Sequence, residues 1–352
     1  MPVTHNNLWH QVVNFENLFN AYGAAARGRR FKPSVLRYRQ HLEEHLVNTL
    51  NLLTWKQWVP SRFKEFYVFD PKQRLISAPP FKDRVVHHAL VQVIAPLFEK
   101  KFINDSFACR TGKGTHAAKE RTEFFTAAAH KKWGEYYVLK GDIKAYFHSI
   151  NRGVLLELIE RTVSDKDVLW LIRGIVESDG DAQGIPIGAL TSQLFANVYL
   201  GALDHFLKDD LGVKMYVRYM DDFVVIHNDK EYLKQLLAEI DAFITNRLWL
   251  TLNPKTTIYK SGAGVCHAID FCGYRIWPGY TKPRKSTVKR ARKRFKKLSV
   301  LYAEGKLALS RVSASVVSFA GYMKHCSGGA TLESVCSKTV LARASAYNQE
   351  VL

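Results

Sequence analysis

The chain has 352 residues, of which 47% are hydrophobic, and a formal charge of +19 from 51 Lys and Arg against 32 Asp and Glu. This hydrophobic fraction excludes a largely disordered chain, and the length leaves room for two or three lobes. The basic excess favours a polyanionic partner, because neutralising phosphates releases counterions and so supplies affinity. Nucleic acid is the leading candidate, and an anionic membrane is the rival.

The start of the chain, residues 1–5, lacks the apolar core of a secretory signal, and no apolar run approaches the length of a bilayer span. We therefore expect no membrane partner and a cytoplasmic protein. The cysteines form no C-x-x-C pair and none lies near two histidines at metal-site spacing, so no zinc site is expected. They suit a reducing compartment: Cys109, Cys266, Cys272, Cys326 and Cys336.

Residues 1–60 are expected to be helical. Four leucines recur at helix spacing after 33–34, a Pro-Ser pair that favours a helix start. A basic loop at 27–30 is expected to separate this helix from an earlier one. Short strands and apolar helices, such as 85–98, should follow up to about residue 138. The helical leucines are Leu42, Leu46, Leu50 and Leu53.

Strand-like runs dominate the middle of the chain and alternate with helical stretches. This alternation predicts an α+β lobe with helices on one face of an antiparallel sheet. The expected strands are 136–139, 215–217, 223–226, 250–252 and 271–276. The expected helices are 153–175, 191–208 and 231–247.

The composition changes abruptly after the Trp-Pro-Gly at 277–279, where we place a domain boundary. Residues 282–297 contain ten basic residues and no acidic one. Such a run is often a solvated helix face, but ten uncompensated like charges repel one another, so a polyanionic partner is favoured. Helices are expected near 286–303, 309–325 and 331–349.

Two adjacent carboxylates, Asp221 and Asp222, lie between apolar runs and are expected at the tip of a β-hairpin. On its own, such a pair is as often a solvated turn as a metal site. Side chains opposite each other on neighbouring strands come within about 5 Å, so Asp142, which follows a predicted strand, could join them. Three carboxylates could then hold two Mg²⁺ ions roughly 4 Å apart, as nucleotidyl transfer requires.

Seven motifs in order along the chain resemble those of the reverse transcriptase family. They are K-x-R (Lys72, Arg74), D-R-V-V (83–86), S-F-A-C-R-T-G-K-G-T-H (106–116), D-x-x-x-x-F (Asp142, Phe147), Y-M-D-D (219–222), L-N-P-K-T (252–256) and F-C-G-Y (271–274). The resemblance implies an RNA-directed DNA polymerase with an α+β right-hand fold. By this resemblance 1–60 is an N-terminal helical extension, 61–138 the fingers, 139–278 the palm and 279–352 a helical, basic thumb.

The resemblance also implies a role for individual residues. Asp142, Asp221 and Asp222 would be catalytic and would hold two Mg²⁺ ions. Deoxynucleoside triphosphates would contact Lys72, Arg74, Phe147, Ile187, Gly188, Gln193 and Lys255. The primer grip would be Phe271, Cys272, Gly273 and Tyr274. Template RNA and the RNA/cDNA duplex would contact Arg110, Lys113, Lys289, Arg290, Arg292 and Arg294.

Taken by itself, Phe147 is more readily a core aromatic than a functional residue. In the resembling enzymes an aromatic ring at this position blocks the ribose 2′-hydroxyl, which implies deoxynucleotide substrates. Arg74 could be an ordinary surface charge, but in the fingers its planar fork would clamp a triphosphate, with Lys72 as a weaker candidate. Read without the family, Lys255 is a turn lysine and 271–274 a plain strand.

The segment 184–193 departs from most reverse transcriptases. Ile187-Gly188 stands where Gln-Gly is usual, and Ser192-Gln193 where Ser-Pro is usual. This combination resembles the reverse transcriptases of diversity-generating retroelements, which copy a template RNA with errors at adenines and act with a small oligomeric helical accessory variability determinant protein. Ile187 offers shape but no hydrogen bond to the nascent base pair, and shape alone discriminates by about 1–3 kcal/mol.

Other interpretations stay open from the sequence. Ile187 could be a core residue of an apolar stretch. The chain could be another bacterial reverse transcriptase, of the group II intron or retron type. It could also be a non-catalytic RNA-binding protein on a polymerase scaffold, although such a protein would be expected to lose its metal-binding carboxylates. The template RNA, target gene, priming mechanism and oligomeric state do not follow from the sequence.

Overall fold

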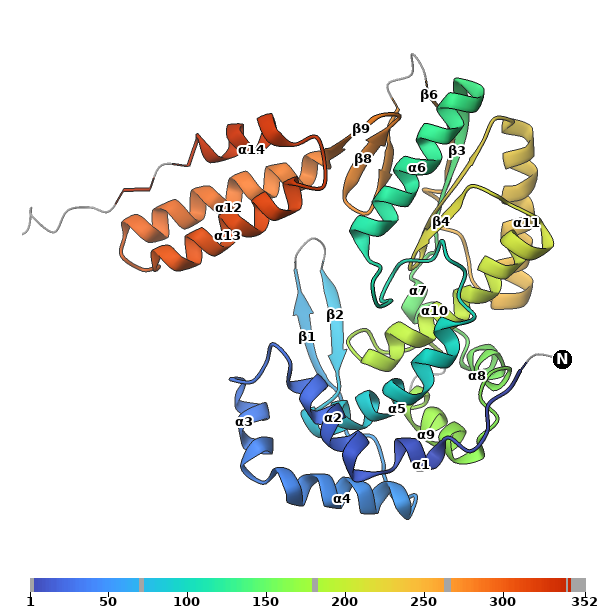
Figure 1. The fold of residues 1–352 in the computed structure, drawn as a ribbon, viewed down its shortest axis with the longest axis vertical. Helices are drawn as coiled ribbons and strands as arrows, with labels where there is room; N and C mark the ends of the chain where they lie inside the picture. The colour runs from blue at the N-terminus through green and yellow to red at the C-terminus, as the bar shows by residue number, and fades with distance from the viewer. Residues whose placement is uncertain (1–2, 70–72, 179–182, 263–266, 340, 343–352) are drawn as a thin grey trace, which may run out of the picture. The chain divides into compact units, whose positions relative to one another are not determined.

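The computed structural model describes residues 3–69, 73–178, 183–262, 267–339 and 341–342. The chain forms two compact units, each assembled from separate stretches of sequence (Figure 1). The first consists of Met1–Gly112, Lys140–Phe223 and Lys234–Thr257, and the second of Lys113–Leu139, Val224–Leu233 and Ile258–Leu352.

The N-terminal part of the first unit is helical, as predicted. Asn14 caps α2 by accepting a hydrogen bond from the Asn17 backbone N–H, and α3 begins at Pro33, where the missing N–H costs nothing. The single helix expected after Pro33 is wrong, because the backbone of His41 leaves the helical conformation and a new helix begins. The helices are α1 (Trp9–Val12), α2 (Phe15–Ala26), α3 (Pro33–Gln40) and α4 (Leu42–Thr54).

The expected helix at 153–175 is also two helices, α8 (Arg152–Glu160) and α9 (Lys166–Val176). Asp165 is the last residue of the non-helical segment between them. One of its carboxylate oxygens accepts hydrogen bonds from the N–H groups at the start of α9, and the other accepts from the N–H groups of Leu8 and Trp9 at 2.6 and 2.9 Å. Asp165 therefore caps two helices that are distant in sequence.

The rest of the first unit packs around two long apolar helices, α5 (Phe81–Glu99) and α10 (Leu190–His205). Helix α5 packs on α2 and α10, and α10 packs on α8. A π-helical segment, η1 (Phe206–Asp210), continues α10. A hairpin of β1 (Lys64–Val68) and β2 (Arg74–Ala78) is antiparallel, with Phe66 opposite Ile76.

A four-stranded sheet has the order β4-β5-β3-β6. Its strands are β3 (Glu135–Asp142), β4 (Tyr216–Tyr219), β5 (Asp222–His227) and β6 (Thr257–Gly262). The predicted hairpin is confirmed, since β4 and β5 are neighbours joined at Met220-Asp221. The strand predicted at 250–252 is wrong, because only Leu252 forms an isolated bridge there, with Ile143. Gly141 in β3 is required by packing, since a Cβ atom there would lie 2.1 Å from the Phe223 ring.

The second unit holds a helix, α6 (Thr115–Trp133), packed on a three-stranded sheet of order β7-β8-β9. The strands are β7 (Ile269–Phe271), β8 (Tyr274–Trp277) and β9 (Tyr280–Pro283). The single strand expected at 271–276 is wrong. Cys272 and Gly273 take left-handed φ angles of 49° and 88°, so the chain reverses and β7 pairs antiparallel with β8.

Three helices complete the second unit: α12 (Lys285–Ala303), α13 (Leu309–Met323) and α14 (Gly329–Cys336). Figure 1 shows α12 and α13 side by side. Their shared core contains Phe295, Phe319, Met323 and Val335. The third helix ends at Cys336, earlier than the 349 expected from sequence; residues 340 and 343–349 of that expectation lie outside the described residues.

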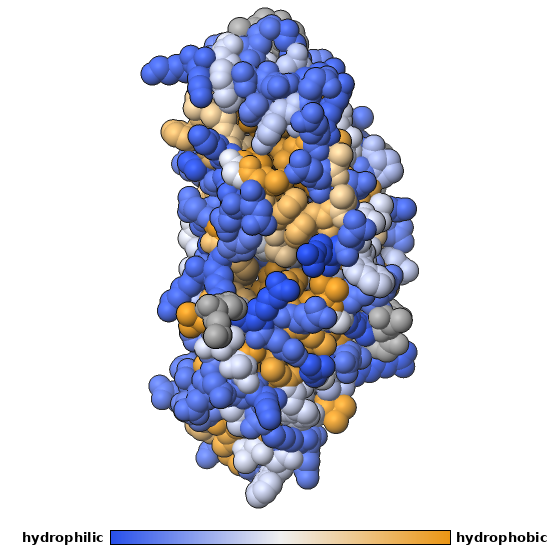
Figure 2. Space-filling model, turned by 90° about the vertical axis from the view of Figure 1, so that its right-hand side faces the viewer, coloured by the Kyte–Doolittle hydropathy of each residue, from blue (hydrophilic) through white to orange (hydrophobic). Residues whose placement is uncertain are grey.

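Hydrophilic residues cover most of the face shown in Figure 2, and hydrophobic ones gather in patches between them. Among the described helices, none is both long enough and apolar enough to traverse a lipid bilayer. The four described cysteines are free thiols, and Cys266 lies outside the described residues.

Candidate active site

The turn that carries Asp221 and Asp222 is fixed by a left-handed residue and a buried arginine. Met220 has a φ of 56°, in a region where residues other than glycine are uncommon. Its carbonyl oxygen accepts a hydrogen bond from Arg218 Nη1 at 2.9 Å. The strained turn is therefore tied directly to a side chain of the preceding strand.

Arg218 is fully buried and forms an ion pair with Asp204 of α10, which is equally buried. Arg218 Nε and Nη2 donate to the two Asp204 carboxylate oxygens at 2.7 and 2.5 Å, and Nη2 also donates to Ser106 Oγ at 3.0 Å. The Tyr216 hydroxyl donates to Asp204 as well, at 2.7 Å. The network satisfies both charges and so fixes β4 against α10.

The three predicted carboxylates come from the ends of neighbouring strands. Asp142 is the last residue of β3, and Asp222 is the first residue of β5. Lys140 Nζ, from β3, lies 3.5 Å from Asp222 Oδ2. Asn253 holds Asp142 through both its backbone and its side chain: its N–H donates to the Asp142 carbonyl at 2.7 Å, and its Nδ2 donates to Asp142 Oδ2 at 2.8 Å.

Burial and the charges of the neighbouring carboxylates together shift the pKa values of the paired aspartates. Burial and, after it, the negative charge of Asp142 raise the pKa of Asp221 to about 6, and the charges of Arg74 and Arg218 oppose this increase. For Asp222, burial is again the main cause: together with the charges of Asp142 and Asp221, and against that of Lys140, it raises the pKa to about 7. The three carboxylates therefore repel one another across a partly desolvated site.

These residues suit a divalent cation in ligand type and in charge. Carboxylate oxygens are the ligands that Mg²⁺ prefers, and Asp222 Oδ1 is buried without a hydrogen-bond partner. As they stand, however, no three His, Cys, Asp or Glu side chains in the part of the chain that is described are grouped closely enough to enclose a metal ion. Metal binding by the three aspartates therefore stays a prediction.

Arg74 and Phe147 lie in the first unit with the carboxylates. The positive charge of Arg74, the first residue of β2, reaches Asp221 and lowers its pKa. Phe147 lies in a short helix, α7 (Tyr146–Ser149), and its ring is half-buried, in edge contact with the Tyr146 ring. Its carbonyl accepts a hydrogen bond from the Ile185 N–H at 2.9 Å, which links it to the segment that departs from the family pattern.

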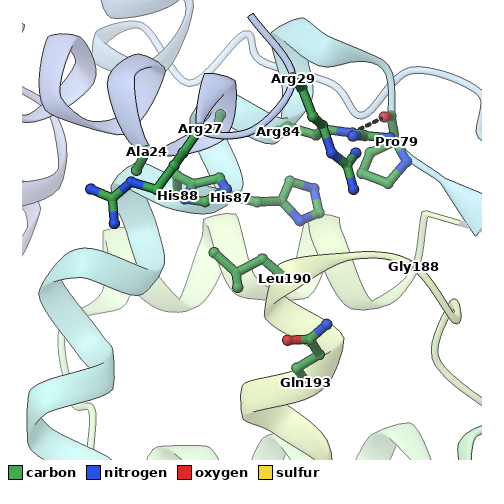
Figure 3. Close-up of a pocket in the computed structure, with 11 residues that line it drawn as sticks. Ala24, Arg27, Arg29, Pro79, Arg84, His87, His88, Gly188, Leu190 and Gln193 are labelled. Carbon is green, nitrogen blue, oxygen red and sulfur yellow. Dashed lines mark hydrogen bonds between the residues drawn. The ribbon is translucent and has the colours of Figure 1, made fainter. Parts of the chain in front are cut away.

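In that segment, Ile187 is only half-buried. It is therefore not a core residue, which was the alternative left open by the sequence. Its carbonyl accepts a hydrogen bond from the Ser77 N–H at 2.9 Å, and its side chain lines a cavity of about 520 Å³ together with Leu75. Gly188 and Gln193 line a second cavity (Figure 3).

Two further residues, Lys255 and Lys72, are predicted to contact the nucleotide. Lys255 is exposed in a turn, where its N–H donates to Asn253 Oδ1 at 3.1 Å. Lys72 lies outside the described residues.

Arg110 is placed differently from our expectation of a template contact. Its side chain is 5% exposed and pairs with Glu99 at 2.7 Å. Its Nη1 donates to the carbonyl oxygens of Ile103 and Ser106. The guanidinium is therefore used inside the protein, where it fixes the loop. Lys113, the other residue predicted from this loop, is half-buried.

The residues expected to grip a primer divide into two kinds. Phe271 and Tyr274 are fully buried, and the Tyr274 ring stacks on Tyr322 with 4.8 Å between centroids. Only the turn of Cys272 and Gly273 is accessible, and the Gly273 carbonyl accepts a hydrogen bond from the Tyr322 hydroxyl at 2.7 Å. Any contact with a primer would therefore be made by this turn.

The basic run expected to contact nucleic acid forms helix α12. Ala291 and Phe295 face its core, whereas the predicted contact residues are exposed. Arg292 donates a hydrogen bond to Ser334 of α14 at 3.3 Å. The exposed residues are Lys289, Arg290, Arg292 and Arg294.

Sequence reasoning missed four residues that shape this site. Asn253 lay within one of the recognised motifs and could have been noticed there. Arg218 could have been noticed as a charge in an otherwise apolar strand. Asp204 and Lys140 carried no signal, because their partners are distant in the sequence or on another strand.

Residues 69–276, more than half of the chain, match a family described as reverse transcriptase (RNA-dependent DNA polymerase). The chain belongs to the reverse transcriptase family. It therefore contains an RNA-dependent DNA polymerase domain, and the expected α+β fold of that class is confirmed.

Several curated proteins are similar to this chain over large parts of its length. Protein YkfC of Escherichia coli is 22% identical over 284 residues, covering 69% of this chain and 73% of that protein. The group II intron-encoded protein LtrA of Lactococcus lactis is 24% identical over 245 residues, covering 65% of this chain. The chain spans 39% of the length of LtrA.

The solved structures that are similar to this reverse transcriptase include telomerases of two yeasts. Telomerase from Candida albicans, in complex with a fragment of telomeric RNA, has a TM-score of 0.49 and 14% identity, covering 82% of this chain and 57% of that one. Apo telomerase from Candida tropicalis also has a TM-score of 0.49, with 13% identity, covering 84% of this chain and 64% of that one.

Proposed function

We propose that this protein copies a template RNA into cDNA from deoxynucleoside triphosphates, using Asp142, Asp221 and Asp222 as its catalytic carboxylates. The observation that carries the proposal is the placement of these three residues at the ends of the neighbouring strands β3 and β5, where their charges affect one another. A non-catalytic descendant would have no reason to keep three mutually repelling, partly buried carboxylates.

The chain's own residues supply charge and position at this site. Asn253 orients the Asp142 carboxylate, and Arg218 holds the turn that displays Asp221 and Asp222. Arg74 offers a cation to the triphosphate. Two Mg²⁺ ions held by the aspartates would activate the primer hydroxyl and stabilise the leaving pyrophosphate.

Primer extension on an RNA template tests this proposal. Purified protein is expected to extend a DNA primer annealed to RNA when deoxynucleotides and Mg²⁺ are supplied. Asp221→Asn should abolish extension, whereas Asp241→Asn, an exposed change on α11 (Lys230–Leu248), should leave it unchanged. Extension that survives Asp221→Asn would contradict the proposal.

We further propose that copying is error-prone at template adenines, with the diversification of a target gene as its role. The support is Ile187: it is half-buried beside a cavity, and it cannot supply the hydrogen bond that the usual Gln would give to a nascent base pair. Ile187→Gln and Ile187→Asn should lower misincorporation opposite adenine. Errors opposite the other three template bases are the internal control, and an unchanged adenine error rate would defeat the proposal.

A small oligomeric helical accessory protein of the accessory variability determinant type is the proposed protein partner. The support is charge alone: the basic excess of the chain offers a docking surface to an acidic protein. Complex formation with the purified accessory protein should weaken as salt is raised from about 50 to about 500 mM. No complex at low salt would count against this partner, and a complex insensitive to salt would count against charge as the basis of docking.

The relatives favour a second candidate, an intron-type reverse transcriptase. LtrA is described as group II intron-encoded, and nuclear intron maturase 2 of Arabidopsis thaliana is 30% identical over 96 residues, which cover 27% of this chain and 12% of that protein. Sequencing the cDNA that purified protein makes on a defined RNA separates the two candidates. An accurate copy at adenines would favour the intron type.

A further inference from the structure

A cavity of about 240 Å³ lies in the first unit, and none of the three aspartates lines it. Arg27 and Arg29, from the turn that follows α2, line it together with Arg84 of α5. Gly188 and Gln193 contribute from the segment that leads into α10 and from α10 itself. Figure 3 shows Arg29 and Arg84 beside the ring of His87, with Leu190 and Gln193 on the opposite helix.

The charge of this cavity is positive and uncompensated. Three guanidinium groups line it, and no Asp or Glu side chain does. Within the described residues, Arg27, Arg29 and Arg84 form no salt bridge, and Arg84 Nε donates to the Pro79 carbonyl at 2.9 Å. Burial lowers the pKa of Arg84, and the charge of Arg29 lowers it further, so the two cations lie close enough to repel each other. Such a concentration of cations would be relieved by a bound anion.

Two histidines complete the wall without adding charge. His87 is buried, and its Nδ1 forms a hydrogen bond with Thr191 Oγ1 at 2.9 Å. Burial lowers the pKa of His87 to about 3. The pKa of His88 is also lowered, mainly by burial and in addition by the charges of Arg84 and Arg29. Both imidazoles are therefore neutral near pH 7, and the positive potential of the cavity comes from the arginines.

We propose that this cavity binds a phosphate group, with Arg29 as its principal ligand and Arg27 and Arg84 completing a three-arginine clamp. The planar guanidinium fork matches phosphate oxygens in pairs, and the cavity holds a phosphate with several waters at about 30 Å³ each. The inference rests on the proposed function in one respect: the phosphate belongs to the RNA strand or to the incoming nucleotide, because Gly188 and Gln193 share the cavity.

Binding assays without catalysis test this site. The probe is a fluorescein-labelled 20-nucleotide oligouridylate, measured by anisotropy in EDTA at several salt concentrations. Arg29→Gln is expected to weaken binding about tenfold, since it removes one charged hydrogen bond, and to reduce the salt slope by about 0.7. Arg30→Gln is the matched control, because Arg30 is the adjacent exposed residue, removes the same charge and does not line the cavity. It should change affinity by less than about twofold.

A second arm identifies the source of the phosphate. Binding of dTTP to the same variants is measured by equilibrium dialysis. A loss confined to oligouridylate assigns the cavity to the RNA strand, and a loss confined to dTTP assigns it to the nucleotide. Equal effects of Arg29→Gln and Arg30→Gln on both ligands would overturn the inference, because the loop would then act only through its net charge.

Arg29→Lys provides a variant that keeps the charge but loses the fork, and it should bind more weakly than the native protein. Melting temperatures of all variants are compared to exclude unfolding. A failure of the proposed polymerase function would show separately, as native protein that binds RNA but does not extend a primer.

Discussion

Arg218 Nη1 donates a hydrogen bond to the carbonyl oxygen of Met220 at 2.9 Å, while the same guanidinium pairs with Asp204 out of contact with solvent. The turn that displays Asp221 and Asp222 is thus held by a charge pair in the interior. Since two desolvated charges stabilise the fold only while each has its partner, the site depends on Asp204 although Asp204 does not reach it.

Asp204→Asn should lower the free energy of unfolding by about 3–5 kcal/mol, because it leaves a buried guanidinium uncompensated. Urea unfolding followed by circular dichroism measures this. Asp209→Asn is the control: Asp209 is exposed in η1, and its loss should change stability by about 0.5 kcal/mol or less. Similar losses of unfolding free energy in the two variants would contradict this role of the buried ion pair.

Asn253→Ala should lower kcat for primer extension about tenfold and raise the Mg²⁺ concentration needed for half-maximal extension. The reason is that the Asp142 carboxylate loses the Asn253 amide that orients it, and a hydrogen bond to a charged group is worth about 1.5–3 kcal/mol. Steady-state kinetics across a Mg²⁺ titration measure both effects. Asn246→Ala, on the exposed side of α11, serves as control. An unchanged Mg²⁺ requirement would remove Asn253 from this positioning role.

Phe147→Ala should raise ribonucleotide incorporation relative to deoxynucleotide incorporation by roughly 10–200-fold, the range for excluding one small group from a pocket. Competing rUTP and dTTP in single-nucleotide extension gives the ratio. Phe124→Ala, which removes an exposed ring from α6, should not change it. Unaltered sugar selectivity in Phe147→Ala would show that the ring only packs.

The native protein should lose stability relative to His87→Gln as pH falls from about 6.5 towards 3. Burial lowers the pKa of His87 in the folded state to about 3, while the unfolded chain keeps a value near 6.5. The unfolded chain therefore takes up a proton that the folded protein cannot, and the difference in unfolding free energy falls by about 1.4 kcal/mol for each pH unit in that window. Urea titrations at several pH values test this, with His10→Gln as an exposed control. A pH-independent difference would contradict it.

Reversing the charge of four exposed residues on α12 should weaken binding of an RNA/DNA duplex. The slope of its salt dependence should fall by about 0.9 for each phosphate that is no longer neutralised. The four residues are Lys289, Arg290, Arg292 and Arg294. Anisotropy measured across a salt series gives the slope. Lys289→Glu alone should lower this slope more than Lys338→Glu, which changes an exposed residue beyond α14. A slope unaltered by the four changes would mean that the basic face of α12 is merely solvated.

The local patterns of the sequence determined much of this protein. Apolar runs on either side of Asp221 and Asp222 predicted the hairpin, and leucine periodicity predicted helix at 42–53. The errors were also local: the backbone of His41 interrupts a helix, and Cys272-Gly273 reverses a strand. Periodicity records which side of an element is buried, but it does not record a single residue in an unusual conformation.

The tertiary structure decided how the charges are paired. Arg110 looked like a template contact until its pairing with Glu99 placed it inside the protein. The partnerships of Arg218 with Asp204 and of Asn253 with Asp142, like the three arginines around one cavity, join residues far apart in sequence. The role of a charge depends on its burial and on its nearest partner, and both are set only when the packed chain has excluded water.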